Sequence, residues 1–247
     1  MRKLGWLLLL VAGSALAQGF DHSHKTLDAL LKKHVVLLDG GTASQVRYAE
    51  FSRERASLKA YLASLSAVPE AAFRGWTRPQ QMAFLINAYN GFTIEKILTR
   101  YPDIGSIWDF GKLFGNPFKD NFFTLFGRKF TLDGIEHETL RKKGVYDEPR
   151  VHFAVNCASV GCPMLREEAY VAERLDAQLE EQTRRFLSDR TRNRVAAGRL
   201  AVSKIFGWFK EDFAPHARFF ARYADLFPGA DLQAPMTFLE YDWTLND

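Results

Sequence analysis

The part of this sequence that most constrains its fold is the segment 150–166, RVHFAVNCASVGCPMLR, which contains both cysteines of the chain. Apolar residues alternate with other residues from Val151 to Cys157. This period of two predicts a short buried β-strand that directs Cys157 to its apolar face and His152 to the opposite face. The small residues between the two cysteines predict a tight loop after the strand. The segment is therefore the best candidate for a functional site.

The first residues have the pattern of an export signal. A charged start, a short apolar run and small residues ending at Ala17 predict a signal peptide over residues 1–17. We therefore expect the remaining chain, 18–247, to be a periplasmic protein. It contains no run that is apolar enough to span a membrane.

The charge of the chain is nearly balanced. The sequence has 33 Lys and Arg against 29 Asp and Glu, and without Arg2 and Lys3 of the predicted signal peptide 31 basic residues remain, a formal charge of +2. The basic residues form small separate clusters, whereas proteins that bind nucleic acid usually concentrate them on one face. We therefore expect no nucleic-acid partner.

Hydrophobic periodicity predicts an α+β fold. The elements that it indicates are a long helix from Thr77 to about residue 98, a hairpin over 122–132, a helix over 135–141 and a half-buried strand over 239–245. The sequence shows no repeat and no linker. We therefore expect a single domain over 18–247, with helices packed on a small, mainly antiparallel sheet.

Five motifs occur in a characteristic order. They are FLINAYN (84–90), IEHETLR (135–141), HFAVNCASVGCP (152–163), IFGWF with a following DF (205–213) and YDWTLN (241–246). In this order they resemble the domain-of-unknown-function family 547. Ala158 stands where the loop of that family usually has glycine, which makes a positive φ there less favourable. The resemblance implies no activity, so function has to be inferred from the residues.

One hypothesis is thiol chemistry. A cysteine attacks as the thiolate and needs a nearby base, so Cys157 is the candidate nucleophile and His137 its candidate base. Glu136, Asp242 or an asparagine would orient the imidazole, and backbone N–H groups of residues 158–161 would form an oxyanion hole. This would be acyl hydrolase or transferase chemistry on peptide or cell-envelope material, in a papain- or transglutaminase-like α+β fold.

The competing hypothesis is a disulfide between Cys157 and Cys162. Closing so short a loop stabilises the folded chain by about 2 kcal/mol in the chain-entropy model. An exported protein meets oxidising conditions, which favour the bond. A bonded Cys157 is not a nucleophile, so the two hypotheses exclude each other unless the bond is regulatory.

With the disulfide formed, the chain is expected to be a non-catalytic module that binds an unknown peptide, protein or small molecule. The polar residues expected around its cleft are Asn87, Asn90, Glu136, His137, Arg141, His152 and Arg166. Arg141 or Arg166 would pair with a ligand carboxylate. The same residues would also suit a buried polar network. A third alternative is a zinc site of Cys157, Cys162, His137 and His152, although the cysteine spacing is loose for zinc. No other cofactor is expected.

Overall fold

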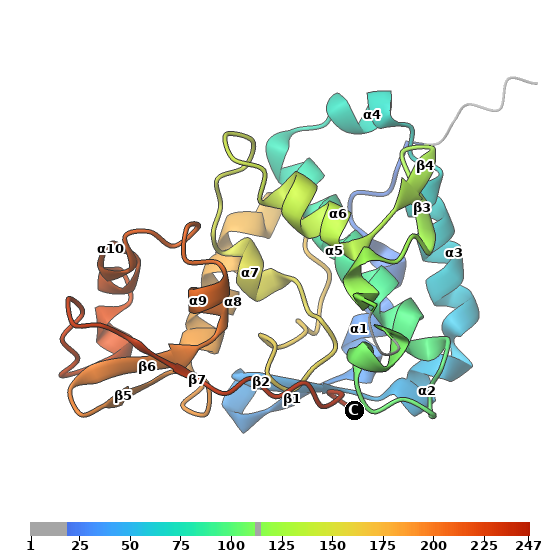
Figure 1. Cartoon of the computed structure of the whole chain (residues 1–247). Helices are drawn as coiled ribbons and strands as arrows, with labels where there is room; N and C mark the ends of the chain where they lie inside the picture. Colours follow the sequence, from blue (N-terminus) through green and yellow to red (C-terminus); the bar gives the residue numbers. More distant parts are fainter. Residues whose placement is uncertain (1–18, 112–114) are drawn as a thin grey trace, which may run out of the picture.

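The computed structural model describes residues 19–111 and 115–247 (Figure 1). The signal peptide predicted for residues 1–17 lies outside the described residues. Within them, helices dominate and the strands are short, so the fold class is α+β, as predicted. No helix in these two ranges is long and apolar enough to cross a membrane.

The helices of the described residues differ widely in length. They are α1 (Lys25–His34), α2 (Tyr48–Arg53), α3 (Arg55–Ser66), α4 (Glu70–Arg74), α5 (Arg78–Leu98), α6 (Leu132–Ile135), α7 (Val151–Ala154), α8 (Leu175–Ser188), α9 (Ile205–Trp208) and α10 (His216–Ala221). A π-helical turn, Glu136–Leu140, follows α6 directly, so most of the helix expected over 135–141 is present.

The strands form three small sheets instead of the one expected. Two are antiparallel hairpins, β1 (Val35–Leu38) with β2 (Ala43–Val46) and β3 (Phe123–Leu125) with β4 (Arg128–Phe130). In the third, β6 (Arg199–Ser203) pairs antiparallel with β5 (Arg194–Ala196) and parallel with β7 (Thr237–Leu239). The pairing is therefore mainly antiparallel, as predicted.

The helix α5 is the centre of the larger apolar core. Its start is stabilised by a capping box, in which Thr77 Oγ1 accepts from the Gln80 N–H and Gln80 Oε1 accepts from the Thr77 N–H. Side chains on nearly every face of the helix are buried from Met82 onward. A second core, rich in phenylalanine, is built by α8, α9, α10 and β6 and lies on the left of Figure 1. The helix α7 lies between the two cores.

The prediction of a strand from Val151 to Cys157 is wrong. Residues Val151–Ala154 form the helical turn α7, and the chain becomes extended only at Val155. The turn is buried on all sides, because Val151 belongs to the larger core while Phe153 stacks on Phe186 of the second core at 5.0 Å between ring centroids. A short run that is apolar on several sides satisfies both helical and extended patterns, so periodicity alone did not distinguish them.

The strand predicted over 239–245 is only partly correct. The regular strand β7 ends at Leu239, and the following residues pair instead with the loop between the cysteines. The Val160 N–H donates to Thr244 O at 2.8 Å and the Gly161 N–H to Asp242 O at 2.7 Å. A Cβ on Gly161 would lie 2.8 Å from the Asp242 backbone nitrogen and oxygen, so glycine permits this close approach.

Candidate functional site

A pocket of about 320 Å³ opens between the two cores, beside the cysteine loop. Its lining combines aromatic rings with a few polar groups. The aromatic side chains are Tyr89, Trp108, Phe118, Trp208, Phe209, Tyr241 and Trp243. The ionisable groups besides tyrosine are Asp133, Glu136, His137 and His152, and both cysteines also contribute to the wall.

Tryptophan rings form the outer part of this pocket. Trp208 is 48% exposed and Trp108 is 39% exposed, whereas Glu136 and His152 are 8% and 3% exposed. Trp243 joins the two exposed rings, because its centroid lies 5.9 Å from Trp208 and 5.3 Å from Trp108. The pocket therefore has an apolar aromatic mouth and a polar interior.

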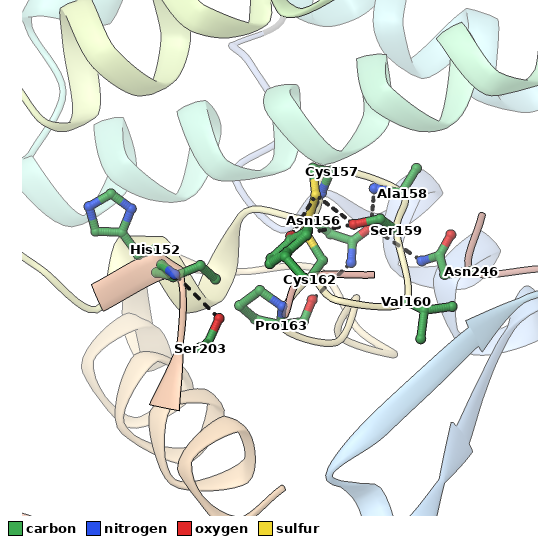
Figure 2. The surroundings of a disulfide bond; sticks show 12 residues. His152, Asn156, Cys157, Ala158, Ser159, Val160, Cys162, Pro163, Ser203 and Asn246 are labelled. Carbon is green, nitrogen blue, oxygen red and sulfur yellow. Dashed lines mark hydrogen bonds between the residues drawn. A yellow bond between two sulfur atoms is a disulfide. The ribbon is translucent and has the colours of Figure 1, made fainter. Parts of the chain in front are cut away.

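Cys157 and Cys162 form a disulfide in the pocket wall (Figure 2). Their Cα atoms are 6.2 Å apart, and the Cys157 N–H donates to Cys162 Sγ at 2.9 Å. Cys157 Sγ also lies 3.1 Å from Ser159 Oγ and 3.2 Å from Tyr241 Oη. In this state Cys157 has no thiol to act as a nucleophile, and neither cysteine offers a thiolate to zinc. Within the described residues, no group of three or more His, Cys, Asp or Glu is arranged to hold a metal ion.

The loop after Cys157 has little capacity for an oxyanion hole. Ala158 adopts φ 60°, a region that favours glycine, and so has the conformation expected for the position where the related loops carry glycine. Its N–H donates to Asn156 Oδ1 at 2.9 Å. The N–H groups of Val160 and Gly161 donate to the C-terminal segment. Three of the four donors proposed for the oxyanion hole are thus already bonded within the protein.

A charged network holds His152 in the pocket wall. His152 Nε2 lies 2.7 Å from Asp212 Oδ2, and Arg141 Nε donates to the same oxygen at 2.5 Å. Phe209 stacks on the imidazole with centroids 4.1 Å apart, and the Arg141 guanidinium carbon lies 4.4 Å from the Phe209 ring centroid. Burial opposes ionisation of Asp212, but the hydrogen bonds from His152 and Arg141 outweigh it and lower its pKa to about 2.

Glu136 lies on the other side of the same imidazole. Its carboxylate is 3.7 Å from His152 Nδ1 and 4.0 Å from His137 Nδ1. Burial raises the pKa of Glu136, yet the neighbouring histidines and Arg141 more than compensate and keep the pKa below its ordinary value. Asp133 lies 3.6 Å from His137 Nε2, and burial raises its pKa. Glu136 is therefore an ionised carboxylate in the pocket interior at neutral pH.

The predicted pair Cys157 and His137 shares the pocket without a direct bond. His137 Nδ1 lies 2.7 Å from Arg141 Nη1, and the hydrogen bonds of Cys157 go to other groups. His152, which the predicted strand directed away from Cys157, lines the same pocket. This correction follows from α7, because a helical turn rotates the side chain of His152 relative to Cys157 in a way that a flat strand does not.

The two asparagines expected to bind ligand contact the backbone of neighbouring segments. Asn90 Nδ2 donates to Ala154 O at 2.9 Å, and its Oδ1 accepts from the Asn156 N–H at 2.8 Å. Asn87 makes the equivalent pair of bonds with the Tyr170 backbone. Both amides are buried, and their hydrogen bonds satisfy backbone N–H and C=O groups of two irregular segments that pack on α5.

Arg166 and Asp242 are also directed away from the pocket. Arg166 donates to Glu168 at 2.7 Å and to Glu181 at 2.6 Å. Asp242 is exposed, and its Oδ1 accepts from the Thr244 N–H at 2.8 Å. The expected Arg141–carboxylate contact does occur, but its partner is Asp212 of the protein itself. The ion pairs of both arginines are internal, so neither guanidinium is presented to a ligand in the pocket.

Four residues of the site were not predicted from the sequence, namely Asp212, Phe209, Trp208 and Tyr241. Asp212 lies 60 positions from His152, and no local pattern connects the two. The only signal was their presence in the last two of the five ordered motifs.

The family model described as "Protein of unknown function, DUF547" matches residues 73–187. Residues 73–187 belong to this family. The DUF547 segment contains α5, α7 and the disulfide, and therefore one wall of the pocket. The opposite wall, with Trp208, Tyr241 and Trp243, follows the matched range. No curated protein and no solved structure matches the chain.

Proposed function

We propose that this protein binds a small organic molecule or a peptide side chain in the aromatic pocket, with the Cys157–Cys162 disulfide as a structural part of the wall. The observation that carries the proposal is the combination of an aromatic pocket of about 320 Å³ with an ionised carboxylate in its interior. Ligand sites are typically apolar concavities with a few placed polar groups.

The exposure of the aromatic mouth supports binding over simple packing. Trp208 and Trp108 are both exposed, and each of them contacts Trp243. Burying such large apolar rings would be favourable. A contiguous apolar patch rimmed by polar groups is typical of a binding surface. A ligand in the pocket would cover this surface and bury the apolar area of the tryptophan rings.

The test uses the tryptophans as reporters. Protein labelled with 5-fluorotryptophan is titrated with indole, a neutral aromatic probe, and followed by ¹⁹F NMR. We expect the resonances of Trp208 and Trp243 to shift, and that of Trp76 to remain unchanged because it packs against the larger core and does not line the pocket. Equal shifts at Trp76, or no shift at the pocket tryptophans, would contradict the proposal.

A second candidate is thiol chemistry after the disulfide is reduced. It is favoured by the two hydroxyls, of Ser159 and Tyr241, that lie near Cys157 Sγ and would stabilise a thiolate. A dithiol reductant would donate two electrons and two protons to release both thiols. The Cys157 thiolate would then attack an acyl carbonyl, expel the leaving group and be regenerated when water hydrolyses the thioester.

This candidate is tested with reduced protein and an electrophilic peptide probe. Cys157→Ser should abolish labelling, whereas Cys162→Ser should retain it and Tyr241→Phe should slow it. Equal labelling of Cys157 and Cys162 would contradict a specific nucleophile. A periplasmic location is part of both proposals, and the disulfide supports it because such bonds persist in oxidising compartments.

A further inference from the structure

The charge of the pocket indicates which ligands it would accept. Besides tyrosine, its ionisable lining consists of two carboxylates, of Asp133 and Glu136, and two imidazoles, of His137 and His152, while no lysine or arginine of the described residues lines it. Arg141 and Asp212 lie just behind the wall and neutralise each other through their ion pair. The pocket interior is therefore a region of negative potential.

Glu136 is the group on which this potential depends. The residue is 8% exposed, and the ionisable side chains within 4 Å of its carboxylate are the imidazoles of His152 and His137, at 3.7 and 4.0 Å. Both separations exceed a hydrogen bond. No lysine or arginine of the described residues lines the pocket beside this carboxylate. A cation that enters the pocket would therefore form an ion pair with Glu136 in a partly desolvated site, where the attraction is stronger than in water.

The aromatic mouth of the pocket also attracts cations. The faces of Trp and Tyr rings carry negative partial charge and attract cations, and clusters of such rings are known to hold alkylated ammonium groups. Trp208, Trp243 and Tyr241 are mutually in contact, with centroid separations of 4.5 to 5.9 Å. All three line the pocket that contains Glu136, and Trp208 is the most exposed of them, so a cation would meet the Trp208 ring first and the carboxylate next.

From these contacts we infer that the ligand is an organic cation, with an alkylated ammonium group placed between the Trp208–Tyr241–Trp243 rings and the Glu136 carboxylate. This inference rests on the proposed function, since it names the class of ligand for the same pocket. It also reverses the expectation from the sequence, in which arginines would have bound a ligand carboxylate. The reason is that those arginines are already paired within the protein.

The test compares choline with 3,3-dimethylbutanol, which has the same shape but carbon in place of the charged nitrogen. Titrations of the unreduced protein are followed by tryptophan fluorescence. Since only the charged compound is attracted by the ring faces and by the carboxylate, the neutral compound should bind at least about tenfold more weakly. Benzoate, which carries the opposite charge, should bind more weakly than either.

Variants separate the charge from the shape of the pocket. Glu136→Gln should weaken choline binding by about tenfold and change 3,3-dimethylbutanol binding by less than about twofold, because only the charged ligand interacts with the carboxylate. Trp208→Ala should weaken both ligands. Glu50→Gln, on the exposed side of α2, is the matched control and should leave both affinities unchanged.

The outcomes distinguish this inference from the proposed function. If indole binds but choline binds no more tightly than 3,3-dimethylbutanol, the proposed function would remain intact, and the inference that the ligand is a cation would be overturned. Tighter binding of benzoate would overturn it as well. Absence of binding by indole, choline and 3,3-dimethylbutanol alike would overturn both proposals.

Discussion

The imidazole of His152 and the carboxylate of Asp212 lie 2.7 Å apart across 60 positions of the chain. A carboxylate only accepts hydrogen bonds, so His152 Nε2 carries the proton and Nδ1 faces Glu136. The contact therefore fixes the orientation of the ring in the pocket wall. It also joins the DUF547 segment to the segment after α9 that carries the opposite wall.

Asp212→Asn should destabilise the protein and loosen this wall. Hydrogen bonds to charged partners contribute about 1 to 3 kcal/mol, and the variant weakens those from His152 and Arg141. The free energy of unfolding, measured with urea at neutral pH, should fall by that amount. Glu211→Gln, at the exposed neighbouring position, is the control and should have little effect.

The acid side of the stability profile should change in the same variant. The folded-state pKa of Asp212 is about 2, below its ordinary value of 3.8. Its contribution is therefore fully present above about pH 4 and is lost as the pH falls toward about 2. The wild type should lose stability more steeply than Asp212→Asn in this window, and parallel profiles would contradict the contact.

His24 should make the protein less stable in mild acid. It is 1% exposed and bonds Tyr61 Oη through Nδ1 at 2.7 Å, and burial lowers its pKa to about 4 from 6.5. The unfolded chain then binds a proton that the folded chain excludes, so stability is present above about pH 6.5 and falls toward about pH 4. Between about pH 7 and about pH 5 the loss should be about 2 kcal/mol.

The His24 effect is measured by urea unfolding at both pH values. His24→Phe does not titrate and should show a smaller difference between them, whatever its own stability. His216→Gln, in the second half of the chain, is the matched control and should retain the wild-type difference. A wild-type difference preserved in His24→Phe would assign the effect to another group.

The disulfide should contribute modestly to stability. Closing the short loop between Cys157 and Cys162 stabilises the fold by about 2 kcal/mol in the chain-entropy model, so replacing both cysteines by serine should lower the free energy of unfolding by that amount. The difference between wild type and variant should largely disappear when both are measured with a reductant. Titration of native, unreduced protein should find no free thiol, and two reactive thiols would refute the bond.

Gly161→Ala should separate the cysteine loop from the C-terminal segment. The added Cβ would lie 2.8 Å from the Asp242 backbone, and relieving such overpacking costs about 1 to 3 kcal/mol. Indole binding should weaken too, since Tyr241 moves with that segment. Gly105→Ala is the control, because its Cβ would have no neighbour closer than 3.9 Å. Equal effects of the two substitutions would contradict the close approach.

Several elements were predictable because their signals are local. The start of α5 depends on the N-cap Thr77 and on a glutamine three residues later, and the β3–β4 hairpin depends on a short turn between apolar runs. The α7 turn was not predictable in this way. Val151 and Phe153 are buried by different cores, and a local pattern contains no information about which distant surface covers a side chain.

In the candidate site, too, some features follow from local sequence and others only from the tertiary structure. By itself the sequence determined the α+β class, the likeness to DUF547 and several segments that line the pocket, because propensity, capping and motif order depend on neighbouring residues. Only the tertiary structure decided that Cys157 bonds Cys162, that His152 faces Glu136 and Asp212, and that Arg141 is paired internally. These outcomes depend on which side chains meet within a few ångströms across distant segments, and the packing of the two cores determines those distances.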